Sequence, residues 1–473
     1  MRLTNNKVFL YIFIMAVIVL LMVPFFRMLS GVMVGEESYY HAQMAGRILR
    51  EGIPEIEPLA ARPYFFQPYH FVLAGFSLVL GIGAASFMVP FLCGLGSVIF
   101  FYKILRRFNF RPRKIFLIMA VYVLSPVFIL IFSTSNHHCA ALFFVVFGFY
   151  LFLKEQKKYF IAAAVLFGLA GLFSIFALAF SLAVLTAYCA RKKEHTKRFY
   201  VVLGIAVLVL LSYLRLILYF GLPALEHITL KGVLIKYISD IGGILGYGIF
   251  NILLALLGLY FIWKKGKITL AYSLFFILVI VSFYFNGMNA YLSLAFALFA
   301  GTGLYGLTRM KWHLKLIKKL TILVLIAGLL FSSISYIGRI DAMQPDEEVI
   351  KSLQWLKENS EPGEAVFSHY SKGFWIETVG NRPVVIDSLY PYTSEFKTRI
   401  NDSEKIFESR NLARTKELLD LYKVRYIWID NEMTAGQVWS KEEEGLLFLF
   451  RNEETFDKIY DNEGILIYEY IGG

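Results

Sequence analysis

The strongest constraint on this chain is a succession of long apolar runs that carry almost no charged side chains. A helix that crosses a bilayer needs about 20 such residues. Residues 8–26 form an uninterrupted apolar run directly after Arg2 and Lys7. Of the 473 residues, 58% are hydrophobic and only 17% are charged, more apolar surface than a water-soluble fold can bury. The sequence therefore predicts a polytopic α-helical membrane protein.

The basic residues predict how the chain crosses the membrane, because Lys and Arg accumulate in cytoplasmic loops. An interfacial helix is expected at 69–80, and the basic loops at 154–158, 191–198, 264–267 and 309–319 then all face the cytosol. This scheme predicts a protein of the cell membrane with about 11–13 spans, a cytoplasmic N-terminus and an extracytoplasmic C-terminal region. The expected spans are 8–26, 85–102, 115–133, 138–153, 159–173, 174–190, 199–220, 242–263, 268–286, 289–308 and 320–338.

Charge divides the chain into two expected domains. Residues 1–340 hold nine acidic and 32 basic residues, whereas residues 341–473 hold 26 acidic and 15 basic ones. Short β-branched runs alternate with a helical pattern in the second part, which predicts a soluble extracytoplasmic α/β domain at 341–473. Loop sorting explains the basic excess of the first part, so nucleic-acid binding is not expected. Cys93, Cys139 and Cys189 are far apart in apolar runs, which argues against a disulfide framework or a thiolate metal site.

The few acids of residues 1–340 gather on the predicted outer side. Five lie in the external loop 27–67, and Glu226 and Asp240 lie in the external loop 221–241, while Glu155 and Glu194 lie in cytosolic basic loops. A third outer turn, residues 133–138, reads STSNHH. Carboxylate, amide and imidazole groups on one face suit Mg²⁺ or Mn²⁺, which would neutralise phosphate at the interface.

Each of these residues also has a structural explanation. Glu36 and Glu37 are acids at the end of a span, where solvated charges are common. His137 and His138 are polar residues at a helix start, and Asp240 is placed to cap a helix. Only the convergence of the three outer loops favours a functional site.

Three short motifs resemble the catalytic subunit of oligosaccharyltransferase, a membrane glycosyltransferase of the GT-C class. Residues 35–41 read GEESYYH, and archaeal members of that family carry Asp-x-Tyr-Tyr-His there, so Glu37 takes the place of the metal-binding Asp. Residues 136–138 read NHH where the family has Asp-His-His, with His138 matching the metal-binding His. Residues 238–240 read ISD and resemble the fifth-loop motif, with Asp240 in place of Glu. The resemblance covers most of residues 1–340.

The resemblance implies inverting transfer of a sugar or glycan from a polyprenyl phosphate or diphosphate to an acceptor on the outer face. Glu36 or Glu37 would deprotonate or orient the acceptor, with Asp240 as a further catalytic carboxylate. The expected ligands of Mg²⁺ or Mn²⁺ are Glu37, Asn136, His138 and Asp240. The expected acceptor or sugar contacts are Tyr39, Tyr40 and His41.

The sequence also departs from the family. The WWDYG acceptor motif is missing, and residues 368–375 read SHYSKGFW at its expected position. The late-span Arg that contacts the donor pyrophosphate is absent from residues 286–290, so Arg215, Lys231 and Lys236 are the candidate phosphate ligands. Two other readings stay open. One is a non-catalytic paralogue that serves as a scaffold, and the other is a lipid or glycan transporter.

Overall fold

The computed structural model describes residues 4–25, 32–57, 59–60, 62–154, 156–192, 195–220, 229–264, 269–342, 344–393, 395–441 and 443–472. The chain forms two compact units, each of which is described here by itself. Unit 1 comprises Met1–Val34 and Gln67–Ala342. Unit 2 comprises Gly35–Phe66 and Met343–Gly473, so the predicted external loop belongs with the C-terminal part of the chain.

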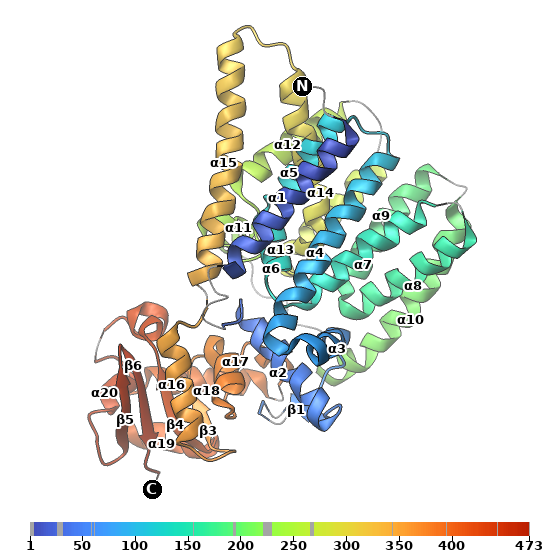
Figure 1. Cartoon of the computed structure of the whole chain (residues 1–473). Coiled ribbons are helices and arrows are strands. Elements are labelled where there is room, and N and C mark those ends of the chain that lie inside the picture. Colours follow the sequence, from blue (N-terminus) through green and yellow to red (C-terminus); the bar gives the residue numbers. More distant parts are fainter. Residues whose placement is uncertain are drawn as a thin grey trace. The chain divides into compact units, whose positions relative to one another are not determined.

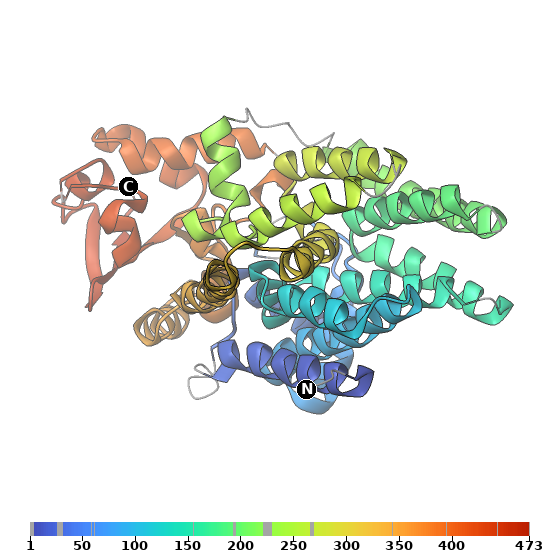
Figure 2. The same ribbon diagram turned by 90° about the horizontal axis from the view of Figure 1, so that it is seen from above.

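In the part that the structure describes, the regular elements of unit 1 are helices, apart from one isolated β-bridge between Ile238 and Tyr247 (Figure 1). Among the described residues, five helices are long and apolar enough to cross a membrane: α1, α4, α10, α14 and α15. Seen from above, α7 to α10 lie side by side at one edge of the bundle (Figure 2). The helices are α1 (Asn5–Phe25), α3 (Pro68–Leu80), α4 (Ile82–Arg107), α5 (Pro112–Val123), α6 (Pro126–Ser133), α7 (His137–Phe152), α8 (Lys157–Phe173), α9 (Ile175–Arg191), α10 (Thr196–Phe220), α11 (Leu230–Tyr237), α12 (Ile249–Trp263), α13 (Thr269–Tyr284), α14 (Met288–Arg309) and α15 (Lys315–Ala342).

The run expected to form one span at 115–133 is a broken helix. The helices α5 and α6 meet at an angle of 61°. Pro126 begins α6, and Ser125 before it has an extended backbone with ψ of 133°. Proline has no N–H to donate and disfavours helical geometry in the residue before it, so the helix breaks there. The pair is apolar enough to count as a sixth span.

The span expected at 242–263 begins later, at Ile249. Residues 238–248 instead form a tight turn in which Gly242 has a φ of 121°. A Cβ added to Gly243 would lie 2.6 Å from the carbonyl oxygen of Lys236, and one added to Gly246 would lie 2.7 Å from the Ser239 nitrogen. The turn therefore requires glycine at these positions.

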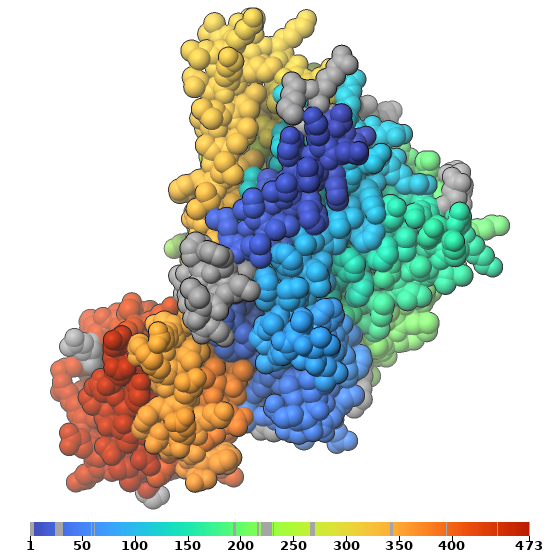
Figure 3. All heavy atoms as spheres, viewed as in Figure 1, coloured from blue at the N-terminus to red at the C-terminus, as the bar shows by residue number. Residues whose placement is uncertain are grey.

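Unit 2 contains a four-stranded sheet with the strand order β3-β4-β6-β5. The strand β3 pairs parallel with β4, and the other neighbours pair antiparallel. The helix α16 packs against β5 and β6. Figure 3 shows the orange segment that contains α16 beside the dark red segment that contains the two strands, on one face of this unit. The elements are α2 (Glu36–Glu51), β1 (Ile56–Glu57), β2 (Arg62–Pro63), α16 (Glu347–Glu358), β3 (Ala365–Phe367), α17 (Gly373–Trp375), α18 (Phe396–Glu408), α19 (Leu412–Leu421), β4 (Val424–Ile429), α20 (Leu446–Leu449), β5 (Phe456–Asn462) and β6 (Ile465–Tyr470).

A buried apolar core fills unit 2 between the sheet and its helices. Phe367, Ile427 and Ile429 from the strands pack with Trp439 and Leu446. The Trp439 Nε1 donates to the Phe407 carbonyl over 2.9 Å, so the buried indole is satisfied. The C-terminal part therefore has the α/β fold that its sequence predicts.

Candidate functional site

The first acidic motif opens the helix α2 of unit 2. Gly35 precedes the helix with a φ of 79°, a left-handed conformation that favours glycine. Glu36 and Glu37 occupy the first turn. Two carboxylates at a helix N-terminus face the positive end of the helix dipole, which stabilises their negative charge.

Glu36 has a strongly shifted proton affinity. Burial and the neighbouring Glu37 charge raise the pKa of its carboxyl from its ordinary value near 4.5 to about 7. A hydrogen bond from the Ser388 hydroxyl, over 3.2 Å, and the Lys372 charge limit this rise. A carboxyl group with a pKa near neutrality is suited to accept or donate a proton at physiological pH.

Glu37 and His41 lie one helical turn apart, and their ligand atoms are within 4.8 Å of each other. A carboxylate oxygen and an imidazole nitrogen at this spacing fit two positions in the coordination shell of a divalent cation such as Mn²⁺. The sequence predicts that His41 contacts the acceptor or sugar, and the structure adds it to the candidate metal ligands. The sequence could have indicated this pair, because Glu37 and His41 are four residues apart and residues at that spacing lie on the same face of a helix.

Tyr39, Tyr40 and His41 are buried rather than presented to solvent. The Tyr40 hydroxyl donates to Glu57 over 2.8 Å, and its ring stacks on Phe374 with centroids 5.1 Å apart. The structure thus gives Tyr40 a role in fixing α2 within unit 2. The predicted sugar or acceptor contact of these three residues stays a prediction.

A buried ionic network ties the segment 35–66 to the C-terminal part of unit 2. The Arg62 guanidinium contacts Glu57 over 2.6 Å and donates to both carboxylate oxygens of Asp387 over 2.7 and 2.6 Å. All three side chains are nearly excluded from solvent. Asp387 also accepts from the Leu389 backbone nitrogen over 2.8 Å, which orients the loop carrying Ser388. Sequence reasoning missed this network because Arg62 and Asp387 are 325 residues apart.

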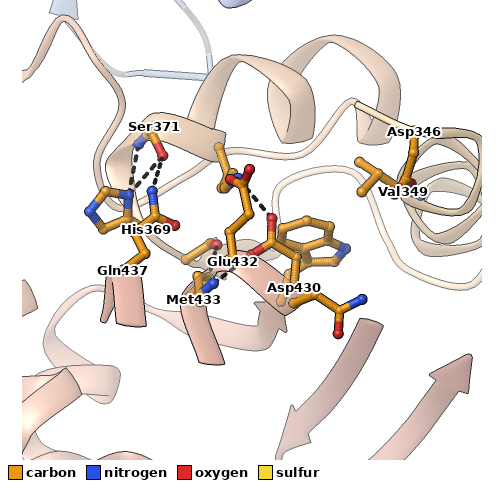
Figure 4. A network of polar contacts seen from close by, with 12 residues as sticks. Asp346, Val349, His369, Ser371, Asp430, Glu432, Met433 and Gln437 are labelled. Atoms are coloured by element: carbon orange, nitrogen blue, oxygen red, sulfur yellow. Dashed lines mark hydrogen bonds and ion pairs between the residues drawn. The ribbon is translucent and has the colours of Figure 1, made fainter. Parts of the chain in front are cut away.

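The segment at the expected place of the WWDYG motif follows β3 and is held by polar contacts (Figure 4). Lys372 is buried, pairs with Asp430 over 2.8 Å and also contacts Glu432. In Figure 4, His369 and Gln437 both point to Ser371, at 2.8 and 3.2 Å from its hydroxyl. Burial and the Lys372 charge lower the pKa of His369 to about 4, so its imidazole is neutral at pH 7.

In unit 1, Asn136 caps the helix α7. Its amide oxygen accepts from the Cys139 backbone nitrogen over 3.1 Å. Its amide nitrogen donates to the carbonyls of Ile131 and Thr134, each over 3.0 Å. The observed role is a helix N-cap, and metal binding by Asn136 stays a prediction.

His138 lies in the first turn of α7, and its Nδ1 is 2.9 Å from the hydroxyl of Tyr291 in α14. The rings of His137 and His138 lie beside each other, with centroids 4.1 Å apart. A hydrogen bond to one ring nitrogen fixes the orientation of an imidazole, as in many metal sites. Tyr291 therefore positions His138.

Asp240 lies in a short 3₁₀ turn, and its carboxylate accepts from the Ile249 backbone nitrogen over 2.6 Å, at the start of α12. The Asn289 amide donates to the Leu245 carbonyl over 2.9 Å, and the Tyr247 hydroxyl donates to the Asn289 carbonyl over 2.8 Å. The same first turn of α14 thus contacts the Asp240 loop and, through Tyr291, His138. The structure brings these two motifs of unit 1 to one helix end.

The candidate phosphate ligands lie on α10 and α11. Lys231 and Lys236 are exposed on α11. Arg215 belongs to α10, and its side chain lies outside the described residues, as do Glu155, Glu194 and Glu226.

Solved structures share this fold. The archaeal oligosaccharyltransferase AglB from Archaeoglobus fulgidus, in complex with an inhibitory peptide and a dolichol-phosphate, matches with a TM-score of 0.63 and 14% identity over 99% of this chain and 74% of that one. The complex of the Archaeoglobus fulgidus oligosaccharyltransferase with Zn and sulfate matches with a TM-score of 0.57 and 15% identity over 96% and 72%. ArnT from Cupriavidus metallidurans bound to undecaprenyl phosphate matches with a TM-score of 0.57 and 11% identity over 98% of each chain.

The chain has the GT-C fold. Both the helical part and the C-terminal sheet fall within these matches, which confirms the fold class that the sequence motifs predicted. No protein-family model and no curated protein sequence matches the chain.

Proposed function

We propose that this protein is a membrane glycosyltransferase that moves a sugar or glycan from a polyprenyl phosphate or diphosphate to an acceptor at the outer face of the cell membrane. The observation that carries the proposal is the GT-C fold, shared over almost the whole chain with AglB and ArnT structures that hold dolichol-phosphate and undecaprenyl phosphate. The acidic start of α2 adds a chemical reason, since it supplies a carboxyl group with a pKa of about 7.

In the proposed reaction, an acceptor oxygen or nitrogen attacks the anomeric carbon as the bond from that carbon to the donor phosphate breaks. The bonding electrons leave with the phosphate, and configuration inverts. Glu36 takes the acceptor proton, for which its pKa near neutrality is suited. Ser388 and the Arg62 network hold the Glu36 side of α2 in place.

A divalent cation, Mg²⁺ or Mn²⁺, would supply charge stabilisation to the departing phosphate. The structure supports Glu37 and His41 as a ligand pair within unit 2. The wider set of Glu37, Asn136, His138 and Asp240 comes from both units and stays a prediction. The structure of the Archaeoglobus fulgidus oligosaccharyltransferase with Zn and sulfate supports the expectation of a metal.

The test uses purified full-length protein with labelled polyprenyl-phosphate sugars, with and without Mn²⁺ and after chelation. Transfer or hydrolysis of the donor is expected in wild type. Glu37→Gln and Asp240→Asn are each expected to lower turnover by about 100-fold or more, the usual scale for a lost catalytic group. The control is Glu51→Gln, an exposed acid at the end of α2. Full turnover in both variants contradicts the assigned roles, and donor binding without turnover in wild type favours the scaffold reading.

A further inference from the structure

Unit 1 contains a cavity of about 910 Å³ that the proposed chemistry does not use. Its walls come mainly from α4, α7, α9, α13 and α14, and the interior is apolar, with Phe167, Leu292 and Leu298 among the lining residues. The volume lies at the upper end of the range for small-molecule sites in proteins, about 300–1,000 Å³. The cavity therefore has room for a large apolar ligand.

The exposed residues of the lining show where the cavity opens. Phe108 and Met310 are 44% and 46% exposed, and Arg191 and Arg309 are exposed as well. These residues end or follow the helices α4, α9 and α14. The mouth thus lies where three helices end, next to the start of α5. In the topology expected from the charges, this is the cytosolic side.

The mouth is positively charged. Lys114, Arg191 and Arg309 line it, and none of the described lining residues is Asp or Glu. The Arg309 guanidinium donates to the Tyr305 hydroxyl over 3.1 Å, and the Lys114 ammonium lies 4.1 Å from the centroid of the Phe110 ring. Tyr305 and Phe110 also line the cavity, so both cations are held at its rim. Three cations at an apolar opening complement an anionic head group.

Three buried hydroxyls give a second, independent indication of a ligand. Ser181, Tyr272 and Thr302 line the cavity, are more than nine-tenths buried, and their hydroxyl oxygens have no hydrogen-bond partner in the described structure. Leaving such a buried group unpaired is energetically unfavourable, because the hydroxyl has lost its hydrogen bonds to water. Thr302 precedes Arg309 by seven residues, which places its backbone about 10 Å along α14 from the mouth. A ligand with hydrogen-bond acceptors behind its head group would therefore pair with hydroxyls of the cavity wall such as that of Thr302.

We propose that this cavity binds an anionic glycerophospholipid of the bilayer. Its phosphate contacts Lys114, Arg191 and Arg309, its ester carbonyls accept from the buried hydroxyls, and its acyl chains fill the apolar interior. Basic pockets between membrane helices on the cytoplasmic side suit such head groups. A polyprenyl phosphate carries no oxygen beyond its phosphate, so it leaves the hydroxyls unpaired. The inference does not depend on glycosyl transfer.

Native mass spectrometry of the full chain, titrated separately with phosphatidylglycerol, phosphatidylcholine and undecaprenyl phosphate, tests the proposal. Phosphatidylglycerol is expected to bind most tightly. Arg191→Gln/Arg309→Gln should weaken its binding by about 10- to 30-fold, since each basic residue near an anionic lipid contributes about 1 kcal/mol. The matched control is Lys311→Gln/Lys315→Gln, which removes the same charge from exposed residues that do not line the cavity.

Two further variants test the interior. Ala183→Phe/Ala295→Phe fills the cavity and should weaken phosphatidylglycerol binding at least tenfold. Thr302→Val keeps the side-chain shape but loses the hydroxyl, and should weaken phosphatidylglycerol severalfold. Equal binding by the arginine pair variant and wild type would overturn the proposal. The proposal would also be overturned if neither interior variant changed phosphatidylglycerol binding. It would likewise be overturned if wild type bound undecaprenyl phosphate more tightly than phosphatidylglycerol. Thermal unfolding without added lipid shows that each variant is folded.

Discussion

Glu36 combines a position at the start of α2 with a pKa raised to about 7. A carboxyl group whose pKa is higher in the folded chain binds its proton more tightly there than in the unfolded chain. Stability is therefore lost as pH rises from about 4.5 through 7. Glu36→Gln removes this dependence and keeps an acceptor for Ser388. We expect the variant to gain on the order of 1 kcal/mol relative to wild type at pH 8 and little at pH 4.5.

Thermal unfolding at the two pH values measures this difference. Glu51→Gln serves as the control because Glu51 is an exposed acid of the same helix. A Glu36→Gln effect of the same size at both pH values would contradict the raised pKa. Activity of the same variant is expected to fall at every pH, because the proposed proton acceptor is gone.

Arg62 is the central residue of the buried network with Glu57 and Asp387. Removing one partner of a buried ion pair leaves the other charges uncompensated, which costs about 3–5 kcal/mol. Arg62→Met should therefore lower the stability of unit 2 by that amount, as measured by thermal unfolding. Arg50→Met, at an exposed position of α2, should change little. If Asp387→Asn rescues none of the Arg62→Met loss, the two residues are not energetically coupled.

At the scale of elements, the packing of α12 on α14 depends on two glycines. A Cβ on Gly258 would lie 1.8 Å from the carbonyl oxygen of Phe299, and one on Gly303 would lie 2.2 Å from that of Leu254. Small residues let membrane helices approach closely. Since α14 also carries Asn289 and Tyr291, its packing positions the Asp240 loop and His138.

Gly258→Ala and Gly303→Ala should each destabilise the protein by about 1–3 kcal/mol, the usual cost of overpacking. The expected readout is a lower unfolding temperature in detergent. Gly204→Ala is the matched control, because a Cβ at this position in α10 meets nothing within 4 Å. If all three variants unfold at the same temperature, the close approach of α12 and α14 is not a source of stability.

Apolar runs in the sequence predicted where helices lie better than they predicted where those helices break or begin. The runs at 289–308 and 159–173 correspond to α14 and α8 because apolar length and flanking charge are local signals. The break at Pro126 and the late start of α12 went unpredicted. In both cases, backbone geometry at proline and glycine overrides an apolar run that looks continuous.

At the scale of the whole molecule, the charge pattern makes a topology prediction that a labelling experiment tests. With the eleven-span scheme, a cysteine at exposed Glu408 should react with a membrane-impermeant maleimide in intact cells. A cysteine at exposed Lys157 should react only after permeabilisation. The reverse pattern would place the C-terminal part in the cytosol and remove the outer-face acceptor from the proposed function.

At the same scale, the candidate site depends on contacts between distant parts of the chain, which the sequence alone does not predict. Motif order and loop charge predicted Glu37, His138 and Asp240 as metal ligands. Each of these residues lies in a short motif, so the residues that identify it are its neighbours in the sequence. The contacts that hold Glu36, from Ser388 and Lys372, join residues more than 300 positions away. No periodicity or spacing reports such pairings, so they emerge only from the folded chain.

The discontinuous make-up of unit 2 has a consequence for biogenesis. Residues Gly35–Phe66 leave the ribosome roughly 280 residues before their partners in Met343–Gly473. At typical elongation rates of about 5–20 residues per second, that delay lasts tens of seconds. During this interval Arg62 and Glu57 have no Asp387, and the apolar side of α2 has no Phe374 to cover it. A nascent chain stalled before residue 343 should therefore be captured there by chaperones or cut by proteases, whereas the completed chain should be protected.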